Sequence, residues 1–260
     1  MKLLLINLDR HPMRLKRMEN LLQGLAFERI AAVDGRTIEG LEKRVNPEPI
    51  SRKDLSRYER ACILSHRAAW SRFLAGADRY CCILEDDVFI SPDFSLFMND
   101  ESWIPERCDL MKIETYDHPV FISRKKVPCL NRHAVQLHST HLGTGAYVLS
   151  RNGASVLLNE TADPDRALDR ILFDETAIRR RSPICQLLPA LCIQGRNLEN
   201  GILFPEMRSS INQERPKKKK TVLKRIKKEI IRPLRQLKKF AERKAFERRM
   251  QACLSTVAFL

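Results

Sequence analysis

The strongest constraint on the fold lies in the first 33 residues, which alternate between strand-like and helix-like apolar patterns. Residues 3–8 form a short, largely apolar run that predicts a buried strand. Residues 9–25 carry apolar side chains at helical spacing, and residues 27–33 predict a second strand before the turn Asp34-Gly35. A strand, a helix and a strand within this length form a βαβ unit, so we expect an α/β fold with a mostly parallel central sheet.

The same alternation continues further along the chain. A helix is expected from about Ser56 to Ala75, and the apolar residues 80–84 predict a central strand. The other predictions are strands at 109–113 and 146–149, helices at 152–158 and 167–179, and irregular segments at 45–54 and 182–215. Because 43% of the 260 residues are hydrophobic, the chain can bury a sizeable core. We expect one globular α/β domain at residues 1–210.

The positive charge of the chain is concentrated in a C-terminal segment. Residues 215–249 hold 17 Lys and Arg against 3 Glu, which accounts for nearly all of the formal net charge of +15. Apolar residues recur there at helical spacing, with a break near Pro233, so residues 211–260 predict a basic amphipathic helical arm. Such a helix favours an anionic membrane surface, contacted through residues 216–249. Nucleic acid is less favoured because this segment has no Tyr or Trp, and a solvated tail or a partner helix is the third alternative.

The cysteines and the N-terminus indicate the compartment. Eight cysteines occur without a C-x-x-C pair, so we expect buried free thiols rather than a zinc ribbon or a redox pair. The apolar start lasts four residues before Asn7, and no stretch reaches the roughly 18 apolar residues of a membrane span. We therefore expect a cytoplasmic protein whose membrane contact is peripheral.

Three adjacent carboxylates, Glu85-Asp86-Asp87, directly follow the predicted central strand. Such neighbours repel one another unless a cation or hydrogen-bond donors compensate them. Hard divalent cations prefer carboxylate oxygens together with substrate phosphates, and open α/β sheets bind ligands at the carboxyl ends of their strands. The sequence therefore predicts a metal–phosphate site here, with a solvated turn as the alternative.

Several motifs occur in an order that resembles glycosyltransferase family 25, the bacterial lipooligosaccharide galactosyltransferases and their relatives. They are Asn7-Leu8-Asp9-Arg10 with Arg14, Val33-Asp34-Gly35, the segment 61–70 with Ser65-His66 and Trp70, Ile83-Leu84-Glu85-Asp86-Asp87-Val88, and Gly143-Thr144-Gly145-Ala146-Tyr147. The resemblance covers roughly residues 1–205. It implies a GT-A-like nucleotide-sugar-binding domain, a UDP-sugar donor (usually UDP-galactose) and a divalent metal, usually Mn²⁺, with Mg²⁺ as a possibility.

The resemblance also assigns donor-site residues. Asp87 is expected to bind the metal, and Glu85 to contact the ribose side of the donor. The other expected donor-binding residues are Asn7, Arg10, Arg14, Ser65, His66 and Asp86. The arginines suit phosphate because a guanidinium donates two parallel hydrogen bonds. The structural alternatives are a solvated helix face for the arginines and a core histidine for His66, with Trp70 serving packing.

A transfer that inverts the anomeric carbon needs a carboxylate base for the acceptor hydroxyl. Asp169 fits the position that the resemblance implies, and Asp165 is its rival. Glu114 and the loop residues Thr144 and Gly145 are expected to bind the acceptor. Because no histidine follows His141, a late metal ligand would have to be a side chain such as Gln194.

The implied function is transfer of a hexose, with galactose favoured, from a UDP-sugar to the outer-core oligosaccharide of a lipid-linked lipooligosaccharide. The implied location is the inner face of the bacterial inner membrane. The alternative from another class is a non-catalytic basic protein that binds membrane or nucleic acid on a degenerate transferase fold.

Overall fold

The computed structural model describes residues 1–38, 55–116, 118–180, 183–195 and 244–260. The first elements are β1 (Lys2–Asn7), α1 (Pro12–Leu21) and β2 (Glu28–Ala31), and β1 pairs with β2 in parallel. Helix α1 has its proline in the first turn, where a missing backbone N–H costs nothing. The predicted βαβ unit is confirmed.

The main sheet has eight strands in the order β2-β1-β3-β10-β5-β11-β9-β8. The strands not yet given are β3 (Tyr80–Glu85), β5 (Leu110–Lys112), β8 (Val127–Cys129), β9 (Arg132–Gln136), β10 (Ala146–Ser150) and β11 (Ile184–Leu188). Among the described strands of this sheet, the parallel pairs are β1 with β2, β1 with β3 and β5 with β11. Strand β10 lies antiparallel between β3 and β5, so the sheet is mixed, and the prediction of a mostly parallel sheet was wrong. An apolar run predicts a buried strand but not its direction.

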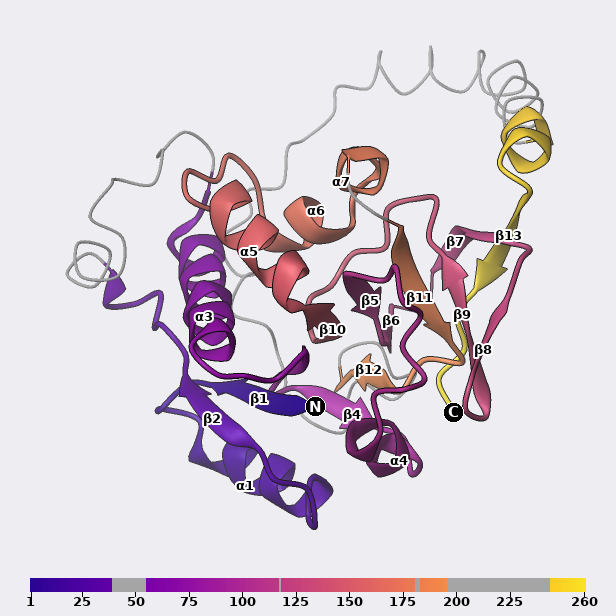
Figure 1. Cartoon of the computed structure of the whole chain (residues 1–260). Helices are drawn as coiled ribbons and strands as arrows, with labels where there is room; N and C mark the ends of the chain where they lie inside the picture. Colours follow the sequence, from indigo (N-terminus) through magenta and orange to yellow (C-terminus); the bar gives the residue numbers. More distant parts are fainter. Residues whose placement is uncertain (39–54, 117, 181–182, 196–243) are drawn as a thin grey trace, which may run out of the picture.

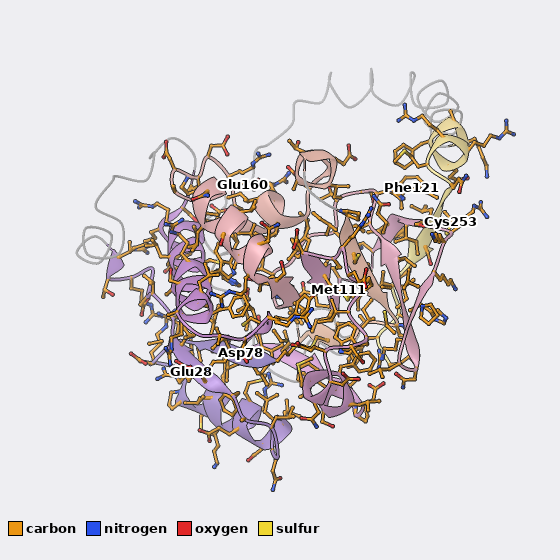
Figure 2. The ribbon with its side chains drawn as sticks, viewed as in Figure 1. Glu28, Asp78, Met111, Phe121, Glu160 and Cys253 are labelled. Carbon is orange, nitrogen blue, oxygen red and sulfur yellow. The ribbon has the colours of Figure 1, made fainter. Side chains whose placement is uncertain are left out.

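Helices cover both faces of this sheet (Figure 1). On one face lie α3 (Arg57–Leu74), α5 (Arg151–Glu160) and α6 (Leu168–Phe173), around a core that contains Trp70 and Tyr147. On the other face, α1 and α4 (Phe94–Asn99) pack through a separate core. Figure 2 shows Met111 in the interior and Glu160 at the periphery. The result is a three-layer α/β/α arrangement.

Helix α3 matches the predicted segment closely because the sequence encodes its start. The Ser56 hydroxyl accepts a hydrogen bond from the Glu59 backbone N–H, and the Glu59 carboxylate accepts one from the Ser56 N–H. This reciprocal capping box fixes the first turn of the helix.

Other segments differ from the prediction. The helix expected at 167–179 is split into α6 and α7 (Glu175–Arg180), because Asp174 is extended and its carboxylate accepts a hydrogen bond from the Ala177 N–H. The segment expected to be irregular contains β11 and β12 (Cys192–Gln194). Strand β12 lies between β4 (Val88–Ile90) and β6 (Glu114–Thr115) in a second, three-stranded sheet.

The end of the chain differs from the predicted helical arm. Residues 244–249 are helical, but β13 (Ala252–Thr256) is a strand that pairs antiparallel with β7 (Pro119–Ser123). Val257 is buried in the core, and its carbonyl accepts a hydrogen bond from Thr115 Oγ1 at 2.6 Å. Residues 252–260 therefore belong to the folded domain. The basic residues 216–243 lie outside the described part of the chain, so the membrane-binding arm stays a prediction.

All eight cysteines are free, six of them buried, as expected. Within the described residues, no helix combines the length and the apolar character needed to cross a membrane.

Candidate active site

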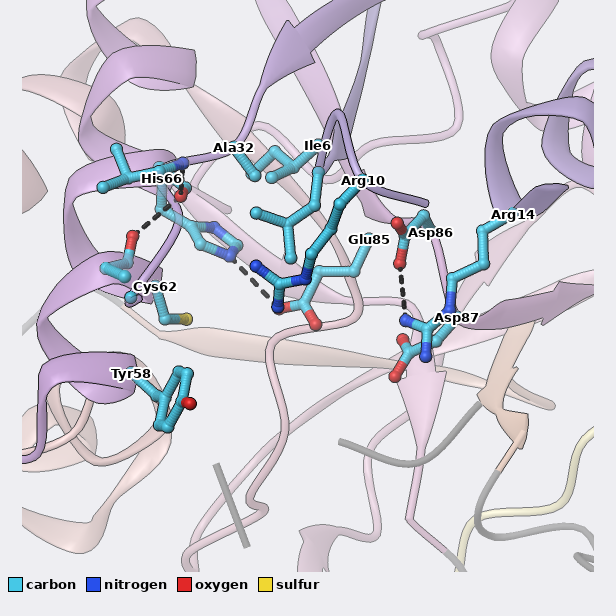
Figure 3. A pocket seen from close by; sticks show the side chains of 15 residues that line it. Ile6, Arg10, Arg14, Ala32, Tyr58, Cys62, His66, Glu85, Asp86 and Asp87 are labelled. Carbon is cyan, nitrogen blue, oxygen red and sulfur yellow. Dashed lines mark hydrogen bonds and ion pairs between the residues drawn. The ribbon is translucent and has the colours of Figure 1, made fainter. Parts of the chain in front are cut away.

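A pocket with a volume of about 140 Å³ lies at the carboxyl ends of the three parallel strands β1, β2 and β3 (Figure 3). Its walls come from these strand ends, the start of α1 and one face of α3. The lining residues are Ile6, Leu8, Arg10, Arg14, Ala32, Val33, Gly35, Tyr58, Ala61, Cys62, Ser65, His66, Glu85, Asp86 and Asp87. The pocket therefore brings together seven of the residues predicted from the sequence: Arg10, Arg14, Ser65, His66, Glu85, Asp86 and Asp87.

Asp86 is anchored by residues from the first βα unit. Its Oδ2 accepts a hydrogen bond of 2.7 Å from Asn7 Nδ2, and its Oδ1 accepts one of 3.1 Å from Arg14. Asn7 is 1% exposed, and Asp86 is 7% exposed. The expected donor-binding residue Asn7 therefore lies behind the pocket, and the pair formed with Asp86 orients Arg14 in the pocket wall.

Arg17, which the sequence analysis did not single out, holds the turn after β3. Its Nη2 donates to the carbonyls of Asp86 at 3.0 Å and Val88 at 2.8 Å, and its guanidinium stacks on Phe89. Burial lowers the pKa of Arg17, while the nearby Asp87 carboxylate raises it. A partly buried cation thus compensates the acidic turn, as three adjacent carboxylates require.

The opposite wall depends on close contacts between α3 and the end of β2. Ser65 Oγ accepts a hydrogen bond of 2.8 Å from the Val33 N–H and donates one of 2.7 Å to the Ala61 carbonyl. A Cβ at Gly35 would lie 2.5 Å from the Tyr58 ring, so this turn needs a glycine to pack there. The hydroxyl of Ser65 therefore joins α3 to the segment that follows β2.

Arg10 forms an ion pair with Asp34 at the rim of this wall. Partial burial raises the pKa of Asp34, but the hydrogen bonds from Arg10 and from the Arg36 N–H, together with the charges of both arginines, outweigh it, and the pKa is lowered overall. Asp34 therefore stays ionised and holds Arg10 in the pocket wall.

His66 connects the pocket to the core. Its Nε2 lies 3.1 Å from Glu85 Oε1 (Figure 3), and its Nδ1 lies 2.7 Å from the Tyr147 hydroxyl. The same Glu85 oxygen accepts a hydrogen bond of 2.6 Å from Thr144 Oγ1. Thr144 was expected to bind the acceptor, but the structure places its hydroxyl on the Glu85 carboxylate.

Glu114 and Gly145 occupy the interior rather than the pocket wall. Glu114 is fully buried, where its carboxylate accepts hydrogen bonds from Lys112 Nζ at 2.9 Å and from the Ala146 N–H at 2.8 Å. Burial raises the pKa of Glu114 and lowers that of Lys112, and their pairing opposes both effects. A Cβ on Gly143 or Gly145 would lie 2.0 or 2.4 Å from the Glu114 carboxylate. These glycines thus permit close packing on Glu114. Because Glu114 is fully buried, the expected contact between Glu114 and the acceptor does not fit the structure.

The two candidate bases lie in different surroundings. Asp169 is half-buried at the start of α6. Burial raises the pKa of Cys62 and the charge of Asp169 adds to this, so Asp169 lies within electrostatic reach of the pocket wall. Asp165 is exposed, pairs with Arg166 at 3.4 Å and lines a separate polar hollow.

Among the lining residues whose side chains carry polar atoms, Tyr58 and Cys62 were not predicted. They precede His66 by eight and four residues on α3, so the helical repeat places all three on one face. That spacing was visible in the sequence. Burial raises the pKa of Cys62 well above its usual value, which keeps the thiol protonated.

Two sets of residues at this pocket have metal-ligand chemistry. Asp87, 7% exposed, supplies a carboxylate of the kind that Mn²⁺ and Mg²⁺ bind. Separately, the ligand atoms of Cys62, His66 and Glu85 lie within 4.8 Å of one another. That mixed sulfur, nitrogen and oxygen set suits Zn²⁺ rather than Mn²⁺.

Comparisons with known proteins show which sequences and structures this chain is similar to. The profile of Glycosyltransferase family 25 (LPS biosynthesis protein) matches residues 1–172, which include every residue lining the pocket. The lipooligosaccharide biosynthesis protein lex-1 of Haemophilus influenzae is 32% identical over 71% of this chain and 67% of its own length. The lacto-N-neotetraose biosynthesis glycosyltransferase LgtB of Neisseria gonorrhoeae is 33% identical over 54% of each chain.

The chain therefore spans between about half and two thirds of the length of these relatives. Among solved structures, a glycosyltransferase involved in the glycosylation of the major capsid of PBCV-1 aligns with a TM-score of 0.42 and 9% identity. That alignment covers 74% of this chain and 91% of the other.

Proposed function

The chain belongs to glycosyltransferase family 25, and from this premise we propose that it transfers a hexose from a UDP-sugar to a lipooligosaccharide acceptor. The observation that carries the proposal is the pocket at the carboxyl ends of β1–β3, where Arg10 and Arg14 lie near the Asp87 carboxylate. Guanidinium groups donate hydrogen bonds to the phosphates of a nucleoside diphosphate. A carboxylate can hold the divalent cation that binds the same phosphates.

The oxygen donors at the turn after β3 fit Mn²⁺ or Mg²⁺. These cations take one or two carboxylates and complete their shell with phosphate oxygens and water. We assign the cation to Asp87, because its carboxylate lines the pocket beside the two arginines that suit a diphosphate. When bound, the cation would neutralise the charge that develops on the departing UDP. Arg10 and Arg14 supply further positive charge from the chain itself.

The nucleoside end of the donor would lie against α3 and β2. The Tyr58 ring lines the pocket there and offers an aromatic face for a base. Glu85, held by hydrogen bonds from His66 and Thr144, would accept hydrogen bonds from ribose hydroxyls. Both contacts place the diphosphate toward Arg14 and Asp87.

We propose Asp169 as the base that takes the proton of the acceptor hydroxyl in an inverting transfer. Its support is its position at the start of α6, within electrostatic reach of Cys62 in the pocket wall. An inverting transfer needs a carboxylate base for the acceptor hydroxyl, and Asp169 would take that role while Asp87 binds the cation.

Galactose as the transferred sugar, the lipid-linked acceptor and attachment to the inner face of the membrane complete the proposal. They are supported by the family and by the names of its relatives, which include lipooligosaccharide and lacto-N-neotetraose biosynthesis. Basic residues 216–249 would contact the anionic membrane surface where the acceptor is anchored.

The test is release of UDP from UDP-galactose in the presence of Mn²⁺. We expect the wild type to turn over the donor and Asp87→Asn to lose at least about 100-fold in rate, because a metal-binding carboxylate is lost. Asp78→Asn, an exposed residue before the opposite end of β3, is the matched control and should retain activity. Equal activity of the wild type and Asp87→Asn would contradict the metal assignment.

A further inference from the structure

Four side chains form a continuous hydrogen-bonded row from the core to the pocket. Trp70 Nε1 donates to the Tyr147 hydroxyl at 2.8 Å, the hydroxyl lies 2.7 Å from His66 Nδ1, and His66 Nε2 lies 3.1 Å from Glu85 Oε1. Trp70 and Tyr147 are fully buried, and His66 is 1% exposed. Glu85 is the member of the row that lines the pocket together with His66.

The chemistry of the groups sets the direction of every bond in this row. The indole N–H of Trp70 can only donate, so the Tyr147 oxygen accepts from it. Burial raises the pKa of Tyr147 well above its usual value, so the hydroxyl keeps its proton. A buried hydroxyl proton needs an acceptor, and His66 Nδ1 is the acceptor in reach. With Nδ1 accepting, the neutral ring carries its proton on Nε2 and donates it to Glu85.

We infer that Trp70 and Tyr147 are positioning residues that lock His66 in its Nε2–H form, so that His66 holds the Glu85 carboxylate in place for the donor. The contact of Glu85 with the UDP-sugar rests on the proposed function. The fixed tautomer of His66 does not depend on it. Thr144 donates to the same Glu85 oxygen, so His66 and Thr144 fix the carboxylate from two elements, α3 and the loop before β10.

The same row determines whether Cys62, His66 and Glu85 can bind a metal ion. A metal ion needs a lone pair on the histidine nitrogen that binds it. In this row the His66 nitrogen beside Glu85 carries the proton, so it cannot bind a metal ion together with Glu85, and the three residues do not form a zinc site.

The direct test is the position of the proton on His66, measured by long-range ¹H–¹⁵N correlation in the ¹⁵N-labelled full chain. The His66 signals are assigned from their loss in His66→Gln. We expect a single Nε2–H tautomer in the wild type. A proton on Nδ1, or displacement of the Nε2 proton by added Zn²⁺, would overturn the inference.

Tyr147→Phe tests the positioning role. It removes the hydroxyl but keeps a ring to stack on His66 at 5.8 Å and to pack edge-on against Phe173. We expect mixed His66 tautomers and a KM for the UDP-sugar that rises about tenfold, the effect of one hydrogen bond, with a smaller change in kcat. Tyr80→Phe, a buried tyrosine outside the row on β3, is the control and should change neither quantity.

The two proposals can fail separately. An unchanged His66 tautomer and an unchanged KM in Tyr147→Phe would overturn the positioning role even in an active transferase. An Nε2–H ring in a protein that turns over no UDP-sugar would support the locked histidine and refute the function proposed for Glu85.

Discussion

Asn7 and Asp86 lie 79 residues apart in the sequence, and a 2.7 Å hydrogen bond joins the Asn7 amide to the Asp86 carboxylate. It links the carboxyl end of β1 to the turn after β3. Arg14 reaches the other oxygen of the same carboxylate. The first βα unit therefore builds one wall of the pocket and also fixes the acidic turn that faces it.

Replacing Asn7 with alanine should weaken both the turn and the donor site. The buried Asp86 oxygen would lose its partner, which costs about 1–3 kcal/mol of unfolding free energy. We expect a lower urea midpoint and weaker UDP binding by calorimetry, because Arg14 loses its fixed position. Asn20→Ala on the exposed side of α1 is the control. UDP affinity unchanged in Asn7→Ala would show that the turn does not depend on this bond.

Asp169→Asn and Asp165→Asn should separate the two candidate bases. Loss of the base should lower kcat by about 10²- to 10⁴-fold in Asp169→Asn, with little change in UDP affinity. Asp165 is exposed and lines a separate hollow, so Asp165→Asn should behave as the wild type. Steady-state transfer to a soluble acceptor gives kcat for both variants. The opposite pattern would assign the base to Asp165.

Asp93 should make the fold sensitive to acid. Partial burial alone would raise its pKa, but hydrogen bonds from Arg132, Ser91 and Asn131 lower it to about 2. Because the folded pKa lies below the ordinary value of about 4, the stabilisation is complete above pH 4 and is lost as the pH falls toward 2. Arg132 also donates to the carbonyls of Ala190 and Leu260, so this ion pair ties the C-terminus to the domain.

We expect Asp93→Asn to lose about 2 kcal/mol of unfolding free energy at pH 6, and to show a flatter dependence on pH between 4 and 2. Urea titrations at several pH values measure both quantities, with Asp78→Asn as the exposed control. A variant whose stability falls with acid as steeply as that of the wild type would refute this role.

The basic arm is tested best without shortening the chain. Deleting residues 216–260 would remove β13 and the buried Val257, so loss of membrane binding could then reflect unfolding. Replacing lysines 217–220 with glutamine keeps the strand. We expect at least tenfold weaker sedimentation with vesicles containing anionic lipid, because each lysine contributes about 1 kcal/mol. Activity on a soluble acceptor should be retained, and unchanged vesicle binding would refute the membrane proposal.

The sequence predicted best where a local pattern determines the structure. The βαβ start, α3 with its capping box and the acidic turn after β3 all follow from short-range periodicity and residue chemistry. The pairing of β10 against β3 and the docking of β13 on β7 depend on contacts far apart in the sequence, which periodicity does not encode.

The difference between local patterns and contacts far apart in the sequence also explains which site residues were predicted wrongly or missed. Arg10, Arg14 and His66 were predicted from the family resemblance, and the structure brings them together in the pocket at the carboxyl ends of β1–β3. Glu114 follows a strand in the same way, yet it is buried because Lys112, two residues earlier, pairs with it. Arg17 and Tyr147 act through partners 69 or more residues away, so no local pattern marks them.

The measurement that tests the central claim most directly is calorimetric titration of the full chain with UDP, UDP-galactose, UDP-glucose and UDP-N-acetylglucosamine, each with and without Mn²⁺. Our account predicts binding that strengthens with Mn²⁺, prefers UDP-galactose, and loses its Mn²⁺ dependence in Asp87→Asn. No binding of any of these nucleotides, with or without the metal, would contradict the assignment of this pocket to a UDP-sugar.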